Sequence, residues 1–384
     1  MKANNIANIV IGLCALSVLS LSAQPFSSGS DGSYGPLNVT SNIVLDLPPD
    51  GKFNCTTIDV APNVTLSFRR NALNTPVYLL ATSNVIINGV IDVSGMSGDL
   101  GFGGAGGPGG FDGGQPSNGP GTLPGDGLGP GAGRGDNTYA GSGSYGSTRS
   151  ITNSLDGATY GNTLILPLIG GSGGGGGQAG LGYYGGGGGG GAILIASDTS
   201  VNIGAAGAIV ARGGAAKQQG FGSGGAVRVV APVVEGTGLV DVRDAASGYN
   251  SYAGVGRIRV DATNRYSLFL SGVGSYTIGK YMHVFPTSPS RLDIVGAAGM
   301  AIAEGTPAPV RVQLPLDAPT NQVVKVQARD FTGIVPITLA VTPDAGPSAR
   351  YDIQIDMSGG NPAQTNVNVV IPAGTTCRIY AWTR

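Results

Sequence analysis

Three segments of the chain repeat one pattern of apolar and polar positions, each over about twenty residues. In each copy an apolar run, a turn, a second run, another turn and a short third run follow one another. Such short runs, rich in valine and isoleucine and bounded by turn residues, predict strands. The copies comprise Val77–Ala81, Val85–Gly89 and Val90–Ser94, then Ala192–Ala196, Val201–Gly204 and Ala208–Arg212, then Ala226–Val230, Val233–Gly236 and Leu239–Arg243.

The same pattern extends on both sides of the three copies. Gly256–Asp261 resembles the start of a fourth copy, and the upstream runs Ile43–Leu47, Thr57–Val60 and Val64–Phe68 fit the first turns. A unit of three short strands cannot bury its own apolar face, so the copies must stack. We therefore predict an all-β domain over residues 24–280, a parallel β-helix or a closely related solenoid.

Glycine occupies every third position in two blocks, from Gly95 to Gly113 and from Gly170 to Gly191, where only Ala179 breaks the series. A period of three fits neither an α-helix nor a strand, but it is typical of a polyproline-II type helix. We predict that the insertion 95–191 is a bundle of such glycine helices, with the apolar run Thr163–Ile169 buried beneath it as a strand. The alternatives are a flexible polyglycine linker and a collagen triple helix.

The C-terminal part, residues 281–384, changes in character. Glycine becomes rarer and short alternating runs appear, divided by proline, aspartate and glycine turns. This pattern predicts a β-sandwich, and it resembles immunoglobulin-like or fibronectin type III modules. Trp382 is expected to be a buried anchor. The seven candidate strands are Leu292–Val295, Val310–Leu314, Val323–Ala328, Ile337–Val341, Tyr351–Asp356, Val367–Ile371 and Cys377–Trp382.

The N-terminus has the layout of a secretory signal peptide, residues 1–23. Met1 and Lys2 precede an apolar run, and small residues lie before Gln24. The alternative is a membrane anchor. In an oxidising compartment Cys55 and Cys377 form either one disulfide or two separate thiols.

Composition narrows the function. Glycine makes up 70 of 384 residues, charged residues only 11%, and the net charge is −1. No basic tract is present, so we expect no nucleic-acid partner. His283 is the only histidine, its neighbours read as strand, and no histidine and cysteine cluster exists, so neither a catalytic triad, zinc nor another cofactor is expected. Structural calcium is an alternative, resting on Asp99, Asp112, Asp126 and Asp136 in glycine-rich turns.

Charged residues recur in the strand repeats. Asp92 and Asp241 take matching positions, with Val210 in the middle copy. Carbohydrate-active β-helix enzymes need carboxylates or an aspartate with a basic residue on one face. We expect instead charge pairs on the solvated face, with Arg212 and Arg243 in one ladder. The charged residues concerned are Asp241, Asp244, Asp261, Arg228, Arg243, Arg257 and Arg259.

The whole chain resembles glycine-rich secreted proteins of bacteria, and its glycine triplets are similar to the polyglycine-II bundles of glycine-rich antifreeze proteins and phage tail adhesins. The resemblance implies a rigid scaffold with recognition on a flat face or at loops. It predicts a secreted, non-catalytic structural or adhesive protein of the cell surface or extracellular matrix. Its contact residues are expected to be exposed aromatics, namely Phe102, Phe111, Tyr139, Tyr145, Tyr160, Tyr183 and Tyr184.

The expected partners are a polysaccharide or another cell-surface ligand, with no membrane contact after signal cleavage. Unpaired edge strands at the ends of the solenoid would allow a homo-oligomer or filament. The alternative functions are a polysaccharide-binding or polysaccharide-degrading β-helix protein and an ice- or surface-binding protein.

Overall fold

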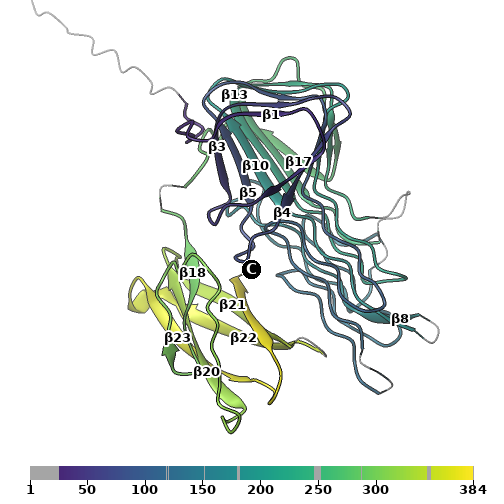
Figure 1. Cartoon of the computed structure of the whole chain (residues 1–384), viewed down its shortest axis with the longest axis vertical. Helices are drawn as coiled ribbons and strands as arrows, with labels where there is room; N and C mark the ends of the chain where they lie inside the picture. The colour runs from purple at the N-terminus through teal and green to yellow at the C-terminus, as the bar shows by residue number, and fades with distance from the viewer. Residues whose placement is uncertain are drawn as a thin grey trace, which may run out of the picture.

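The computed structural model describes residues 26–117, 119, 121–150, 152–179, 182–245, 252–286, 288–343 and 347–383. Apart from one short 3-10 helix, Met357–Gly359, its regular structure is β-strand, so the protein is all-β (Figure 1). The predicted signal peptide lies outside the described residues. Within the described residues, no helix reaches the length and hydropathy of a membrane span.

The strands β1 to β7 and β10 to β17, between residues 35 and 279, form three columns of parallel strands (Figure 1). Together we call these columns the strand stack. The strands β3 and β13 are long enough to run along two columns each. Column 1 contains β3 (Lys52–Val60), β5 (Val77–Ala81), β10 (Ala192–Ser197), β13 (Ala226–Gly236), β15 (Arg257–Asn264) and β17 (Ser275–Gly279).

Column 2 contains β1 (Gly35–Val39), the second half of β3, β6 (Val85–Ile87), β11 (Ser200–Ile203), the second half of β13 and the segment 264–268. Column 3 contains β2 (Ile43–Asp46), β4 (Thr65–Arg69), β7 (Val90–Asp92), β12 (Ala208–Val210), β14 (Leu239–Asp241) and β16 (Ser271–Val273). From β1 to β17 the chain visits columns 2, 3 and 1 in turn.

The pairing register follows the sequence repeats. Val210 pairs with both Asp92 and Asp241, which confirms the matching positions predicted for the three copies. The first and second copies are offset by one residue in column 1, because Val77 pairs with Ile193 and both side chains are fully buried. Alternate side chains of each strand point inward, and they form one apolar core along the whole stack.

The glycine-rich segments leave the strand stack side by side and return to it (Figure 1). We call them the glycine bundle, residues 93–115, 123–146, 170–177, 184–191, 211–225 and 252–256. The last two segments lie outside the predicted insertion 95–191. The hairpin of β8 (Gly177–Ala179) and β9 (Gly182–Tyr184) lies at the far end of the bundle from the stack.

Seven consecutive glycines, Gly185–Gly191, run through the middle of the bundle and donate hydrogen bonds with a period of three. Every third N–H reaches the same neighbouring segment. Gly185, Gly188 and Gly191 donate to the carbonyls of Asp99, Met96 and Val93; Gly186 and Gly189 donate to those of Gly114 and Phe111; Gly187 and Gly190 donate to those of Gly220 and Ser223.

Three further segments donate to the carbonyls of the same run. The N–H groups of Gly104 and Gly107, of Gly171 and Gly174, and of Gly214 reach it. Six segments therefore surround the central run. A Cβ placed on any of its seven glycines would overlap a backbone oxygen, such as the Gly214 oxygen beside Gly187. This packing explains why the run consists of glycine alone.

The bundle continues the hydrogen-bond ladder of column 3. Val93 donates to the carbonyl of Val210, Gly95 to that of Arg212, and Gly98 to that of Ala215. The spacing between donors changes from two residues, as in a strand, to three at Gly95. Strand and glycine segments therefore share one layer.

The apolar run 163–169 is not a strand, contrary to the expectation. Ile165 is nevertheless buried, and it packs with Tyr145, Tyr160 and Ala192 where the bundle joins the stack. Turn-forming hydrogen bonds from the N–H groups of Leu164 and Leu166 to the side chain of Asn162 hold this segment in a compact loop.

The C-terminal unit, residues 291–383, consists of two antiparallel sheets around one apolar core. Six of the seven predicted strands are present. The predicted strand Val310–Leu314 is absent and a short unpredicted strand forms at β19. The first sheet contains β18 (Arg291–Ala297), β19 (Met300–Ala301), β20 (Asn321–Arg329) and β23 (Ala363–Val370), and the second contains β21 (Ile334–Pro343), β22 (Ala349–Asp356) and β24 (Cys377–Thr383).

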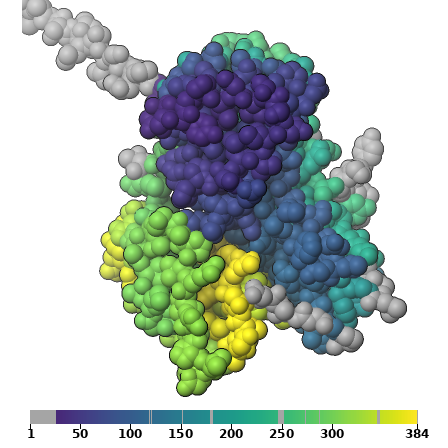
Figure 2. Space-filling model, in the orientation of Figure 1, coloured from purple at the N-terminus to yellow at the C-terminus, as the bar shows by residue number. Residues whose placement is uncertain are grey.

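The C-terminal unit rests against the glycine bundle through its second sheet (Figure 2). The Trp382 ring lies 5.8 Å from the Phe111 ring, edge to face, and both pack with Leu128. Arg350 bonds the carbonyl of Gly127 and lies 3.5 Å from the Asp126 carboxylate. Trp382 is thus a buried anchor, as predicted, but on the outer face of its sheet rather than between the two sheets.

Substitution of a single central glycine tests the packing of the bundle. Gly187→Ala introduces a methyl group against a backbone oxygen, and we expect a loss of about 3 kcal/mol or more in stability. Gly101→Ala is the matched control, since nothing lies within 4 Å of its Cβ position. Thermal unfolding should place the Gly187 variant well below the wild type and the control close to it. Equal melting temperatures would contradict the packing described.

Candidate functional site

The turns at the far end of the glycine bundle expose large apolar side chains. Phe102 is 53% exposed and Tyr139 is 56% exposed. Their turns lie at the same end as β8 and β9. The N–H of Gly185, directly after β9, donates to the carbonyl of Asp99, and the N–H of Asp136 donates to the carbonyl of Gly176, directly before β8. We call these turns the distal turns, and their exposed apolar residues are Leu100, Phe102, Leu123 and Tyr139.

Two further predicted contact residues belong to β9. Tyr183 is partly buried, and Tyr184 is fully buried. The Tyr184 hydroxyl accepts a hydrogen bond from the Gln219 N–H at 3.3 Å. The expected exposure of Tyr184 is therefore wrong, because its ring lies inside the bundle and braces the neighbouring segment.

Tyr145 and Tyr160 are also buried, contrary to expectation. Their rings stack at 4.5 Å between the bundle and the strand stack, with the Arg257 guanidinium over the Tyr145 ring. The Tyr160 hydroxyl bonds the carbonyl of Gly170 at 2.5 Å, and burial raises the pKa of both tyrosines. These rings fill space beside glycines that have no side chains, which is a packing role.

Phe111 is partly buried under Trp382, so it contributes to the contact with the C-terminal unit. Of the seven aromatics predicted as exposed contact residues, only Phe102 and Tyr139 are exposed in the chain itself. Leu100 and Leu123, which the sequence analysis did not select, share their location. A search for apolar residues in turns between glycine triplets, rather than for aromatics alone, would have found them.

Asp241 is fully buried at the end of β14, between two arginines. It accepts hydrogen bonds from Arg212 Nε at 2.7 Å and from Arg243 Nε at 3.0 Å. Burial alone would raise the pKa of Asp241, but the bonds from Arg243 and Arg212 outweigh it and lower the pKa below its ordinary value. The carboxylate is therefore held as an anion whose oxygens are occupied by the chain.

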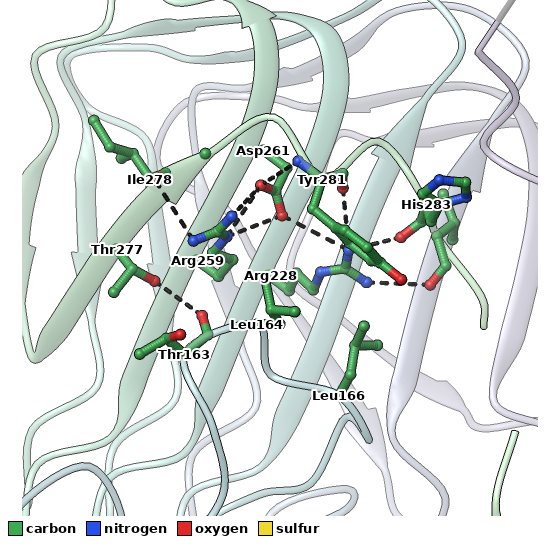
Figure 3. Close-up of polar contacts among 12 residues, drawn as sticks. Thr163, Leu164, Leu166, Arg228, Arg259, Asp261, Thr277, Ile278, Tyr281 and His283 are labelled. Atoms are coloured by element: carbon green, nitrogen blue, oxygen red, sulfur yellow. Dashed lines mark hydrogen bonds and ion pairs between the residues drawn. The ribbon is translucent and has the colours of Figure 1, made fainter.

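A second charged cluster lies on the outer face of column 1 (Figure 3). Arg228 and Asp261 are both fully buried, and their closest charged atoms lie 3.7 Å apart. Arg259, the register partner of Arg228, binds Asp261 through Nε at 3.0 Å and Nη2 at 2.6 Å. The Tyr281 N–H also donates to Asp261 at 2.9 Å.

Arg228 fastens the segment 281–284 to the strand stack. Its guanidinium donates to the carbonyls of His283 at 2.6 Å and Val284 at 3.2 Å, as Figure 3 shows. This segment leads from β17 to the C-terminal unit and covers the cluster. Its residues are not in a strand, contrary to the expectation for the neighbours of His283. The arrangement fixes a connection rather than presenting a carboxylate to solvent.

The cysteines do not form the disulfide considered from the sequence. Cys55 is buried in β3, whereas Cys377 begins β24 of the C-terminal unit, and both are thiols. Burial raises the pKa of the Cys55 thiol to about 11. Within the described ranges, no group of three or more histidine, cysteine, aspartate or glutamate side chains is arranged to hold a metal ion.

Comparisons with protein-family models, with curated proteins and with solved structures found no match to this chain.

Removal of the Asp241 charge tests the first cluster. Asp241→Asn should lower stability at neutral pH by about 2–3 kcal/mol, because hydrogen bonds to a charged acceptor are lost. The pKa of Asp241 is lower in the folded than in the unfolded protein. Its charge therefore contributes stability above the unfolded pKa of about 3.9, and this contribution is lost as the pH falls through the folded-state pKa. Melting curves of variant and wild type should converge in acid. The exposed Asp59→Asn serves as control, and a constant difference at all pH values would contradict the assignment.

Arg228→Met tests the role of the second cluster. The side chain keeps much of its volume but leaves the carbonyls of His283 and Val284 without their donor, so segment 281–284 should open more often. Chymotrypsin should cut after Tyr281 about tenfold faster or more. Arg311→Met, at an exposed position, is the control. Identical cleavage rates in all three proteins would show that Arg228 does not hold the segment.

Proposed function

We propose that this chain is a secreted, non-catalytic adhesive protein that contacts its ligand through the distal turns of the glycine bundle. In this proposal the strand stack is a parallel β-helix, the bundle is a polyglycine-II bundle and the C-terminal unit is an immunoglobulin-like sandwich. The observation that carries it is the central run Gly185–Gly191, whose backbone is hydrogen-bonded to six neighbours.

The packing of that run supports a rigid arm. Every segment of the bundle is linked sideways by backbone hydrogen bonds, and no Cβ separates the central chains. Phe102 and Tyr139 are therefore presented at fixed positions at the end of a stiff support. Preorganised contact residues lose little conformational freedom on binding, and aromatic rings supply large contact area at low entropic cost.

The bound charges support a role without catalysis. Polysaccharide lysis or hydrolysis on a β-helix requires carboxylates that reach the substrate. Asp241 and Asp261 are fully buried, and their oxygens accept hydrogen bonds from arginines of the chain. The distal turns instead expose the aromatic rings of Phe102 and Tyr139, which favours contact with a polysaccharide or another cell-surface ligand.

Adsorption to insoluble polysaccharides tests the proposal. The secreted chain and a Phe102→Ser, Tyr139→Ser double variant are incubated with chitin, cellulose and peptidoglycan, and the bound fraction is measured. We expect the double variant to bind at least about tenfold more weakly to whichever polymer retains the wild type. Val310→Ser with Leu316→Ser is the matched control, since both side chains are exposed on the C-terminal unit.

Two outcomes would contradict the proposal. Equal binding of the double variant and the wild type would move the contact away from the distal turns. Release of soluble sugars by the wild type would favour the polysaccharide-degrading alternative instead.

A further inference from the structure

The two ends of the strand stack match each other. The chain enters at column 2 with β1 and leaves at column 1 with β17, after each column has received six strand segments. The stack therefore comprises six complete turns. A chain continuing beyond β17 would next enter column 2. Since β1 lies in column 2, a second copy placed at this end would continue the same order of columns.

The end formed by β16 and β17 exposes side chains at core positions. Tyr276 and Ile278 are 42% and 52% exposed, although their register partners Ile258 and Val260 are fully buried. Gly272 lies beside the Tyr276 ring, which places that ring over the core. Phe269 is largely exposed nearby. These side chains form an apolar platform that no described segment covers.

The end formed by β1 and β2 shows the same feature. Ile43 is 41% exposed, although its register partner Leu66 is fully buried. Leu45 on the same face is partly buried against the core. Tyr34 is exposed and packs edge to face on Phe53, one turn below. In column 3 this end therefore also stops at a partly uncovered core position, whereas Leu37 and Val39 of β1 in column 2 are buried.

We propose that the β16–β17 end of one molecule stacks on the β1–β2 end of a second copy of this chain. The occupant is identified by shape, because only a three-column stack of the same cross-section extends all columns at once. Ile278 and Tyr276 of one copy then lie against the first turn of the next. The interface is separate from the distal turns, so it does not depend on the proposed ligand contact.

The backbone contributes to the same junction. β16 and β17 are each paired on one side only, as are β1 and β2, so both ends carry open parallel ladders. Pro36 in β1 lacks a backbone N–H. At this end of the stack, β2 therefore offers a more complete set of backbone donors for pairing than β1 does.

This head-to-tail contact does not close on itself. Each added copy presents a new free end, which generates an open filament. Six turns at the spacing of neighbouring strands give a rise of about 29 Å for each copy.

Single-end variants test this junction. Ile278→Arg blocks one end and Ile43→Arg blocks the other, while Ile86→Arg changes an exposed side chain in the middle of the stack. The secreted wild-type chain is concentrated, then followed by sedimentation velocity and negative-stain microscopy. We expect filaments from the wild type and from the Ile86 variant, and monomers from each end variant. Thermal unfolding of every variant verifies that it is folded.

A mixing experiment separates this junction from other association. Each end variant retains one intact end, so an equimolar mixture of the two should form dimers that grow no further. A wild type that stays monomeric at its highest soluble concentration would overturn the proposal, as would filaments from either end variant. Polysaccharide adsorption of the Ile278 variant should remain unchanged, so failure of the assembly and failure of the ligand contact are distinguishable.

Discussion

The lateral backbone hydrogen bond between neighbouring segments is the interaction on which this structure depends. In the strand stack it joins parallel strands in register, and around the central run Gly185–Gly191 it joins extended segments to a chain that has no side chains of its own. The ladder from Val93 through Gly95 to Gly98 passes from one arrangement to the other without a break. The bundle is therefore a continuation of the folded layers rather than a loop attached to them.

This interaction also explains the use of glycine. Where a segment is surrounded on every side, as at Gly187, a single methyl group would displace a neighbouring backbone. Where a segment reaches the surface, as at Phe102, larger side chains are accommodated and exposed. Bulky rings are also buried beside the glycine segments, as Tyr145 and Tyr160 are where they stack at the junction with the strands, and as Tyr184 is at the far end. The same rule thus produces a rigid interior and an apolar tip.

The charged residues secure connections rather than forming an open site. Asp241 holds the arginines that follow β12 and β14, and Asp261 with Arg228 holds the segment that leads to the C-terminal unit. A buried carboxylate is stable only when its oxygens are paired, because removal of an ion from water is costly. With these charges engaged inside the chain, the contact surfaces that we propose are the apolar distal turns and the two ends of the stack.

The sequence by itself determined the all-β class, the strand repeats around Val77, Ala192 and Ala226, and the alignment of Asp92, Val210 and Asp241. It also placed six of the seven C-terminal strands. These features follow from spacing along the chain, which is a local property that side-chain alternation reveals directly. The strand expected within 163–169 failed because burial of Ile165 comes from packing against Tyr145 and Tyr160, not from pairing.

Only the tertiary structure decided which side chains face solvent and which charges meet. Tyr184 and Phe102 occur in similar glycine-rich surroundings, yet one is buried and the other exposed, because the Tyr184 ring lies beside Gly177 and its hydroxyl accepts a hydrogen bond from the distant Gln219 N–H. Likewise, Arg228 meets the carbonyl of His283 across a long sequence separation. Such contacts depend on which layers lie side by side, and local composition carries no information about that.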